Sequence, residues 1–81
     1  MKCIVKGTNG IPIQIEFKDT TTVLEVKKYV QDLQGTHFST FMLVFEGKVL
    51  KDNLLLKEYG IASNSIIQCI EKTEGGYYKS K

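Results

Sequence analysis

The sequence predicts a small α+β domain in which one helix packs against a sheet. Three observations support this: alternating apolar and polar residues at both ends of the chain, one central segment with helical periodicity, and a strand that is apolar on both faces. A chain of 81 residues buries only about 60% of its unfolded surface, so its core is a single contact between two layers. The expected order is strand, strand, helix, strand, strand, helical turn, strand.

The first two strands are expected to form a hairpin. Apolar side chains alternate with polar ones over residues 1–6, and again over residues 11–17, where Ile13, Ile15 and Phe17 share one face. Asn and Gly residues between them tolerate the positive φ of a turn. Pro12 cannot donate a hydrogen bond to a neighbouring strand, which predicts that the second strand lies at the edge of the sheet.

The central segment predicts a helix from about Val23 to Gln34. Thr22 and Glu25 form a capping box, and Gly35 stands where a C-terminal cap belongs. The apolar residues recur at helical spacing and are expected to face the core: Val23, Val26, Val30 and Leu33. Leu24 and Tyr29 lie off this stripe and are expected to be exposed.

The strand over residues 41–45 is apolar on both faces. If Phe41 and its alternate neighbours face the core, Met42 and Val44 must face outward. The last strand, residues 66–70, repeats the pattern, with Ile67 and Cys69 inward and the other three residues outward. Exposed apolar side chains grouped on a sheet usually mark a binding surface. A second covering layer is the alternative, but the chain is too short to favour it.

The remaining segments are expected to be short. Residues 46–47 predict a tight turn into a brief strand, and residues 56–59 predict a helical turn closed by Gly60. Leucines between them are expected to anchor this stretch to the core: Leu50, Leu54, Leu55 and Leu56. Residues 73–76 predict a loosely structured exit, followed by a tail over residues 77–81.

Composition argues against several functional classes. All 11 basic residues are lysines and the net charge is +2, which does not favour specific nucleic-acid binding because that depends on arginine. No segment is long and apolar enough for a membrane span or signal peptide, so a cytoplasmic or nuclear location is expected. Cys3 and Cys69 are expected to be reduced core residues, and His37 a solvated side chain. We therefore expect no enzyme activity, metal or cofactor.

The chain resembles ubiquitin, and residues 1–76 align with ubiquitin without a gap. The shared residues include a characteristic set at fixed spacing: Gly47, Lys48, Leu50, Tyr59 and Ile61. The resemblance implies a β-grasp fold, with a mixed sheet of four or five strands gripping one helix. It implies a ubiquitin-like domain over residues 1–74, a flexible tail over 75–81, and a Tyr59 hydroxyl that closes the preceding loop.

The resemblance also implies a partner-binding patch on the outer sheet face. The matching positions are Thr8, Met42, Val44, Gly47, Lys48, Gln68 and Ile70. Two aliphatic anchors are kept as Val44 and Ile70, whereas Thr8 replaces the third. The implied partners are proteins, namely ubiquitin-binding motifs, proteasome receptors or shuttle factors, bound by a monomer with no nucleic acid and no membrane.

Gly75 and Gly76 leave a second function open. A C-terminal pair of glycines is flexible and has no side chains, so it can thread into a narrow catalytic cleft, as the ends of covalent modifiers do. The resemblance therefore also allows a covalent modifier joined through Gly76 after removal of residues 77–81. However, ubiquitin has a leucine- and arginine-rich segment where this chain has Glu71, Lys72, Thr73 and Glu74, and this favours the non-covalent interaction domain. Lys6, Lys27 and Lys48 occupy positions where ubiquitin builds chains, but most exposed lysines only increase solubility.

Overall fold

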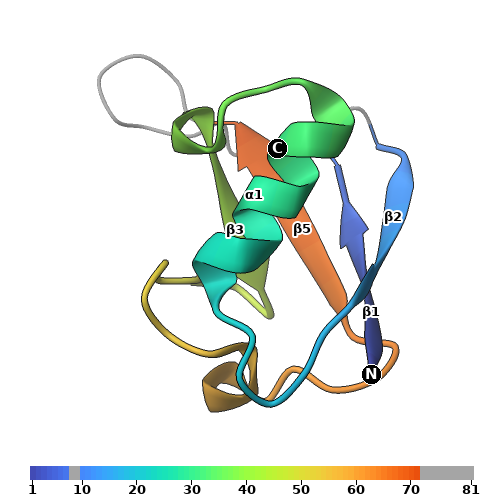
Figure 1. Cartoon of the computed structure of the whole chain (residues 1–81), viewed down its shortest axis with the longest axis vertical. Coiled ribbons are helices and arrows are strands. Elements are labelled where there is room, and N and C mark those ends of the chain that lie inside the picture. Colours follow the sequence, from blue (N-terminus) through green and yellow to red (C-terminus); the bar gives the residue numbers. More distant parts are fainter. Residues whose placement is uncertain (8–9, 72–81) are drawn as a thin grey trace.

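The computed structural model describes residues 1–7 and 10–71 and confirms the α+β class (Figure 1). One helix, α1, lies across one face of a five-stranded sheet whose strand order is β2-β1-β5-β3-β4. The elements are β1 (Lys2–Lys6), β2 (Pro12–Glu16), α1 (Val23–Gln34), the 3-10 helix η1 (Phe38–Thr40), β3 (Phe41–Phe45), β4 (Lys48–Val49), the 3-10 helix η2 (Leu56–Tyr59) and β5 (Ile66–Glu71). None of the helices within residues 1–7 and 10–71 has the length and apolar character to cross a membrane.

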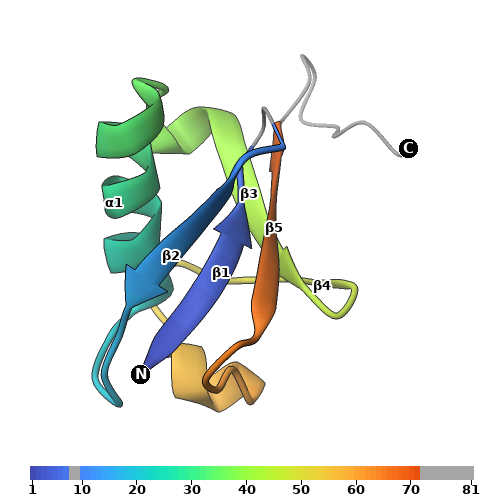
Figure 2. The ribbon, with the colours of Figure 1, turned by 90° about the vertical axis from the view of Figure 1, so that its right-hand side faces the viewer.

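The sheet is mixed, and its parallel pair lies in the middle. β1 pairs with β2 in an antiparallel hairpin and with β5 in parallel, while β3 pairs antiparallel with both β5 and β4. β2 therefore lies at an edge, as Pro12 predicts. In Figure 2, α1 stands on one side of the sheet, and no helix of the described residues covers the opposite face. The alternative of a second layer is therefore not found in this part of the chain.

Helix α1 begins and ends where the sequence predicts. The Thr22 hydroxyl accepts a hydrogen bond from the Glu25 amide at 3.2 Å, and the Glu25 carboxylate accepts one from the Thr22 amide at 3.0 Å. At the other end, Gly35 has a φ of 71°, which residues with a side chain rarely adopt. Both caps satisfy backbone groups that the helix itself leaves unpaired.

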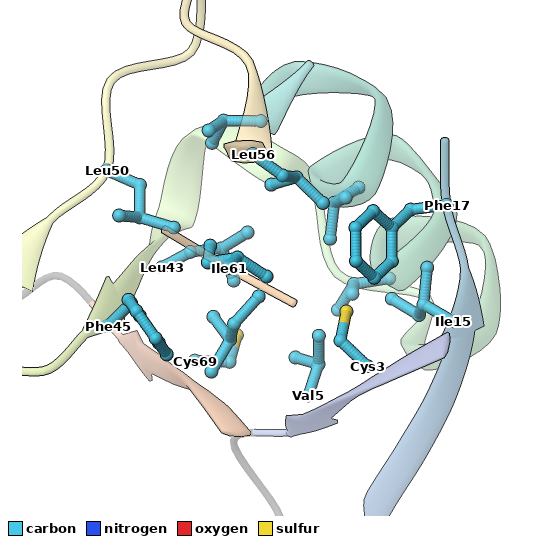
Figure 3. Close-up of a cluster of buried hydrophobic side chains, with 14 of the residues drawn as sticks. Cys3, Val5, Ile15, Phe17, Leu43, Phe45, Leu50, Leu56, Ile61 and Cys69 are labelled. Atoms are coloured by element: carbon cyan, nitrogen blue, oxygen red, sulfur yellow. The ribbon is translucent and has the colours of Figure 1, made fainter. Parts of the chain in front are cut away.

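The core lies between α1 and the inner face of the sheet (Figure 3). The largest fully buried side chains come from every layer of the fold: Phe17, Phe41, Leu43, Leu56, Ile67, Val5, Val23, Val26 and Val30. Leu50 and Leu56 are buried as predicted, whereas Leu54 and Leu55 are only partly buried. η2 and its closing Gly60 are also confirmed.

One predicted core residue of the helix is wrong: Leu33 is 56% exposed. The helix turns about 100° per residue, and its buried face includes Lys27 as well as the valines. Leu33 lies only about 20° around the helix from Val26, which is 1% exposed, so direction alone does not explain its exposure. It differs from Val26 in lying one residue before the end of α1. Tyr29, on the same side, is exposed as predicted, while Leu24 is only partly buried rather than open.

Lys27 is buried, although it occupies one of the lysine positions that ubiquitin uses for chains. Its side chain is 7% exposed, and its Nζ lies 2.9 Å from Oδ1 of Asp52. The Leu24 amide also donates to the Asp52 carbonyl at 3.1 Å. A buried ammonium needs such a partner because an unpaired charge is costly to remove from water. The pair therefore ties α1 to the loop that follows β4.

Both cysteines are buried, and no disulfide joins them, as predicted. The register places Ile4 of β1 beside Ile66, the first residue of β5, whereas Cys69 stands opposite Leu43 of β3. The offset between Cys3 and Cys69 is several residues at about 3.3 Å each, which exceeds disulfide reach. Burial raises the pKa of the Cys3 thiol, so its reactive thiolate form is disfavoured.

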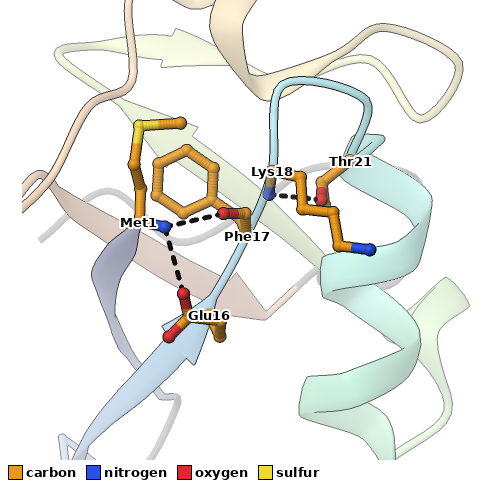
Figure 4. A network of polar contacts seen from close by, with 5 residues as sticks. All are labelled: Met1, Glu16, Phe17, Lys18 and Thr21. Atoms are coloured by element: carbon orange, nitrogen blue, oxygen red, sulfur yellow. Dashed lines mark hydrogen bonds and ion pairs between the residues drawn. The ribbon is translucent and has the colours of Figure 1, made fainter.

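The open end of the first hairpin is closed by the N-terminal ammonium (Figure 4). It donates to Oε2 of Glu16 and to the carbonyl of Phe17, each at 3.0 Å. The Phe17 amide donates in return to the Met1 carbonyl at 2.7 Å. Beyond this point, the Lys18 amide donates to the Thr21 hydroxyl at 2.9 Å, which turns the chain toward α1.

The packing of α1 predicts a large cost for a charge at Val26, which is 1% exposed. Val26→Asp should lower the free energy of unfolding by more than about 3 kcal/mol because it buries an unpaired carboxylate. Lys28→Asp, at an exposed position of the same helix, is the matched control and should change it by less than about 0.5 kcal/mol. Urea unfolding measures both, and equal stabilities for the two variants would refute the packing of α1.

Candidate partner-binding site

The outer face of the sheet is built by strand alternation. Residues that pair directly across neighbouring strands share a face, and one such row runs through Lys6, Gln68, Val44 and Val49. Met42 and Ile70 form the next pair along β3 and β5. Phe41, Leu43, Ile67 and Cys69, at the intervening positions, belong to the core. The predicted outward orientation of the Val44, Gln68 and Ile70 side chains is therefore confirmed.

Met42 lies on this face but is not open to solvent. Its residual exposure is 8%, whereas Val44 and Ile70 are partly exposed. Ile70 stands directly opposite Met42 in β5, and a cross-strand neighbour about 5 Å away removes surface from a long side chain. The expectation that Met42 is an exposed member of the patch is thus wrong in this structure.

Two of the most exposed aliphatic residues on this face were not among the predicted site residues. Ile66 is 48% exposed and Val49 is 47% exposed. Ile66 pairs with Ile4 of β1, which is partly buried, and Val49 pairs with Val44. We call the five side chains Ile4, Val44, Val49, Ile66 and Ile70 the outer apolar face. Alternation along β5 identifies Ile66, but Val49 depends on the register of a two-residue strand.

The rim of this face is formed by the turn between β3 and β4. Glu46 and Gly47 have φ values of 52° and 81°, the combination that a tight two-residue hairpin requires. Lys48 and Gln68 are exposed. Lys48 pairs with Phe45, a core residue, so strand alternation places it on the inner side of the sheet edge and not on the outer face with Val44. Thr8, Gly75 and Gly76, also predicted site residues, lie outside the described residues.

The loop behind β4 holds this rim in place. The Tyr59 hydroxyl accepts a hydrogen bond from the Lys51 amide at 2.9 Å, which confirms that it closes the loop. The Leu50 amide donates to the Leu43 carbonyl at 2.8 Å. Together with the Asp52–Lys27 pair, these contacts fix the chain that leaves β4, and hence the position of Val49.

His37 makes local structural contacts. Nδ1 of His37 accepts a hydrogen bond from the Ser39 amide at 3.1 Å and lies 2.8 Å from the Ser39 hydroxyl, so both side chains serve the start of η1. Within residues 1–7 and 10–71, no three metal-ligating side chains lie together in a group that could hold a metal ion. The outer apolar face offers aliphatic side chains suited to binding another surface.

A five-stranded mixed sheet of this order, gripping one capped helix, defines a ubiquitin-like β-grasp domain. Residues 4–74 match the model of the ubiquitin family, and the chain belongs to that family.

The chain is similar to curated proteins that include two different kinds. It is 37% identical to a segment of a probable ubiquitin receptor, RAD23, of Oryza sativa subsp. japonica, over 83% of this chain. This chain spans only 18% of that receptor's length. It is also similar to the ubiquitin-like protein NEDD8 and to a NEDD8-like protein 2, both of Dictyostelium discoideum, with 29% and 28% identity over 89% of this chain. The matches cover 94% and 90% of those two proteins.

The loop that supports the rim predicts a specific cost for losing one hydroxyl. Tyr59→Phe should lower the free energy of unfolding by about 1 kcal/mol, because the Lys51 amide loses its partner. Tyr29→Phe removes a hydroxyl from a residue that is 47% exposed and should leave stability within about 0.5 kcal/mol. Thermal unfolding of both variants checks this, and an unchanged Tyr59→Phe protein would show that the contact contributes nothing.

Proposed function

We propose that this domain binds other proteins non-covalently through its outer apolar face, with ubiquitin-receptor or proteasome-associated proteins as partners in the cytoplasm or nucleus. The observation that carries the proposal is the grouping of aliphatic side chains on the sheet face opposite α1, which no helix within residues 1–7 and 10–71 covers; Ile66 and Val49 there are each about half exposed. Exposed apolar side chains that cluster in this way are characteristic of protein-interaction surfaces.

The similarity to a segment of a ubiquitin receptor supports this proposal. That relative is much longer than the present chain, so the matching part is one region of a larger protein. A domain within such a protein needs no free C-terminus to act, because its surface makes the contact. The residues before Gly75 differ from those of ubiquitin, and this difference is compatible with a domain that acts through its surface.

The shape of the face indicates the kind of partner. Its aliphatic side chains are small, and Gln68 stands exposed among them, so the face suits an amphipathic helix that presents a narrow apolar stripe. With few anchors and one polar residue among them, the expected dissociation constant is on the order of tens of micromolar or weaker.

A covalent modifier is the alternative function. Its support is that the two NEDD8-type relatives match this chain over most of their own length, together with Gly75 and Gly76 in the sequence. Glu71 and Glu74 stand where ubiquitin has a leucine and an arginine, and they oppose recognition by enzymes that read a basic tail. We therefore favour the interaction domain.

Val44→Ala tests the proposed face. The substitution shortens a central aliphatic side chain and should weaken binding of a helical ubiquitin-binding peptide several-fold. Leu33→Ala is the matched control, since it shortens an aliphatic residue that is 56% exposed on α1 and should leave affinity unchanged. Fluorescence anisotropy gives both affinities. Chemical-shift mapping of the peptide onto α1, away from β3 and β5, would contradict the proposal.

A thioester assay separates the two functions. A chain trimmed to end at Gly76 should be charged by the ubiquitin-activating enzyme orders of magnitude more slowly than ubiquitin, since like charges at an interface cost several kcal/mol and each 1.4 kcal/mol is tenfold. The control carries Glu71→Leu, Lys72→Arg and Glu74→Arg, and should regain charging. Efficient charging of the unaltered trimmed chain would favour the modifier instead.

A further inference from the structure

Two polar side chains interrupt the outer apolar face. Lys6 of β1 and Gln68 of β5 are register partners, and both are exposed. The preceding pair in the same register, Val5 and Ile67, belongs to the core, so strand alternation turns the Lys6 and Gln68 side chains outward. We call these two residues the central polar pair.

Aliphatic side chains surround this pair. Ile66 and Ile70 stand two residues before and two residues after Gln68 in β5, so they share its face. Val44 is the register partner of Gln68 in β3. Gln68 therefore has an aliphatic neighbour on three sides, and Lys6 lies on the fourth.

The charge of Lys6 has no opposite charge beside it in the sheet. Its register partner in β2 is Pro12. The carboxylates that border this face lie further away, because Glu16 stands four residues along β2 from Pro12 and Glu46 lies in the turn between β3 and β4. The ion pairs formed within residues 1–7 and 10–71 use the N-terminal ammonium and Lys27. The middle of the outer face therefore complements a carboxylate.

The central polar pair imposes a condition on any partner that covers the face. A purely apolar surface would remove the Gln68 amide and the Lys6 ammonium from water without giving them hydrogen-bond partners, which costs free energy. A carboxylate can accept a hydrogen bond from the Gln68 side-chain amide and pair with the ammonium. Because the centre of an interface is the part most completely removed from water, a mismatch there weakens binding more than one at the rim.

The spacing of the aliphatic residues sets the spacing required of a helix that lies along β5. Ile66 and Ile70 are four residues apart, which is about 13 Å along a strand. At 1.5 Å per residue, a helix covers about 10 to 12 Å in seven or eight residues, and residues seven positions apart share one face. The helix positions i+3 and i+4, midway between them, lie on opposite sides of that line. One of them can therefore meet Val44 while the other meets Lys6.

Given that the outer apolar face binds proteins, on which this inference rests, we propose that it selects a helix with a carboxylate at the centre of its apolar stripe. Such a helix has aliphatic residues at positions i, i+3 and i+7 and a glutamate or aspartate at i+4. Its aliphatic residues contact Ile66, Val44 and Ile70, and its carboxylate contacts the central polar pair. Lys6 and Gln68 thus determine which helices the face accepts.

The probe is the capped peptide AKALAQLEKQLAKAA, and its matched control AKALAQLQKQLAKAA has glutamine in place of the central glutamate. The two residues have similar helix propensities, so the comparison isolates the charge. The unaltered protein should bind the glutamate peptide about three- to tenfold more tightly, as measured by titration of the ¹⁵N-labelled protein, with chemical-shift changes in β1, β3 and β5. Equal affinities with those shifts would overturn this inference and leave the proposed function standing. Shifts confined to α1, or no binding of either peptide, would contradict both.

Exchange of the two charges tests the role of Lys6. Lys6→Glu should bind the lysine peptide AKALAQLKKQLAKAA more tightly than the glutamate peptide, because opposite charges then meet again. Lys28→Glu is the matched control, since it makes the same change in net charge at an exposed position of α1, and it should keep the preference for the glutamate peptide. The same preference in both variants would show that the peptides respond to net charge alone, and would overturn the assignment of Lys6.

Discussion

The parallel pairing of β1 with β5 is the contact on which the rest of the structure depends. It joins the hairpin of β1 and β2 to the antiparallel unit of β3, β4 and β5, and it links residues more than sixty positions apart in the chain. Forming it requires closure of a long loop, whose entropic cost must be offset by burial. The core side chains of α1 and both halves of the sheet supply that burial. The outer apolar face reaches β1 because this pairing places Ile4 beside Ile66.

Local signals in the sequence predict most of the fold. The capping box at Thr22 and the glycine at position 35 mark both ends of α1, because caps act within one turn of the chain. Alternation predicts the inward residues of β3 and β5, and Pro12 predicts an edge strand. The assignment of Leu33 to the core fails because helical spacing gives the direction of a side chain around the helix and not whether the core extends to that end of it. Lys27 shares the buried face, and only its long-range partner Asp52 makes that possible.

The candidate site could be predicted in part. Val44, Gln68 and Ile70 follow from alternation and from the resemblance, and they lie together on the outer face. The exposed fraction of Met42 could not be predicted, since it depends on the neighbour that the β3–β5 register places opposite it. Val49 was missed for a different reason: a two-residue strand is too short for alternation to reveal which face its side chains take.

The burial of Lys27 has a consequence for how modification of this protein should be interpreted. An ε-amine that is held against Asp52 inside the fold cannot meet an acyl donor while the native state persists. Acetyl, ubiquitin-type or reagent adducts at this position would therefore form at a rate set by transient opening of α1 from the β4–η2 loop, and not by the chemistry of the amine. The exposed Lys6 and Lys48 would report surface encounter. The ratio of adducts at the buried and exposed amines would thus measure, within a single sample, how often the native state opens locally.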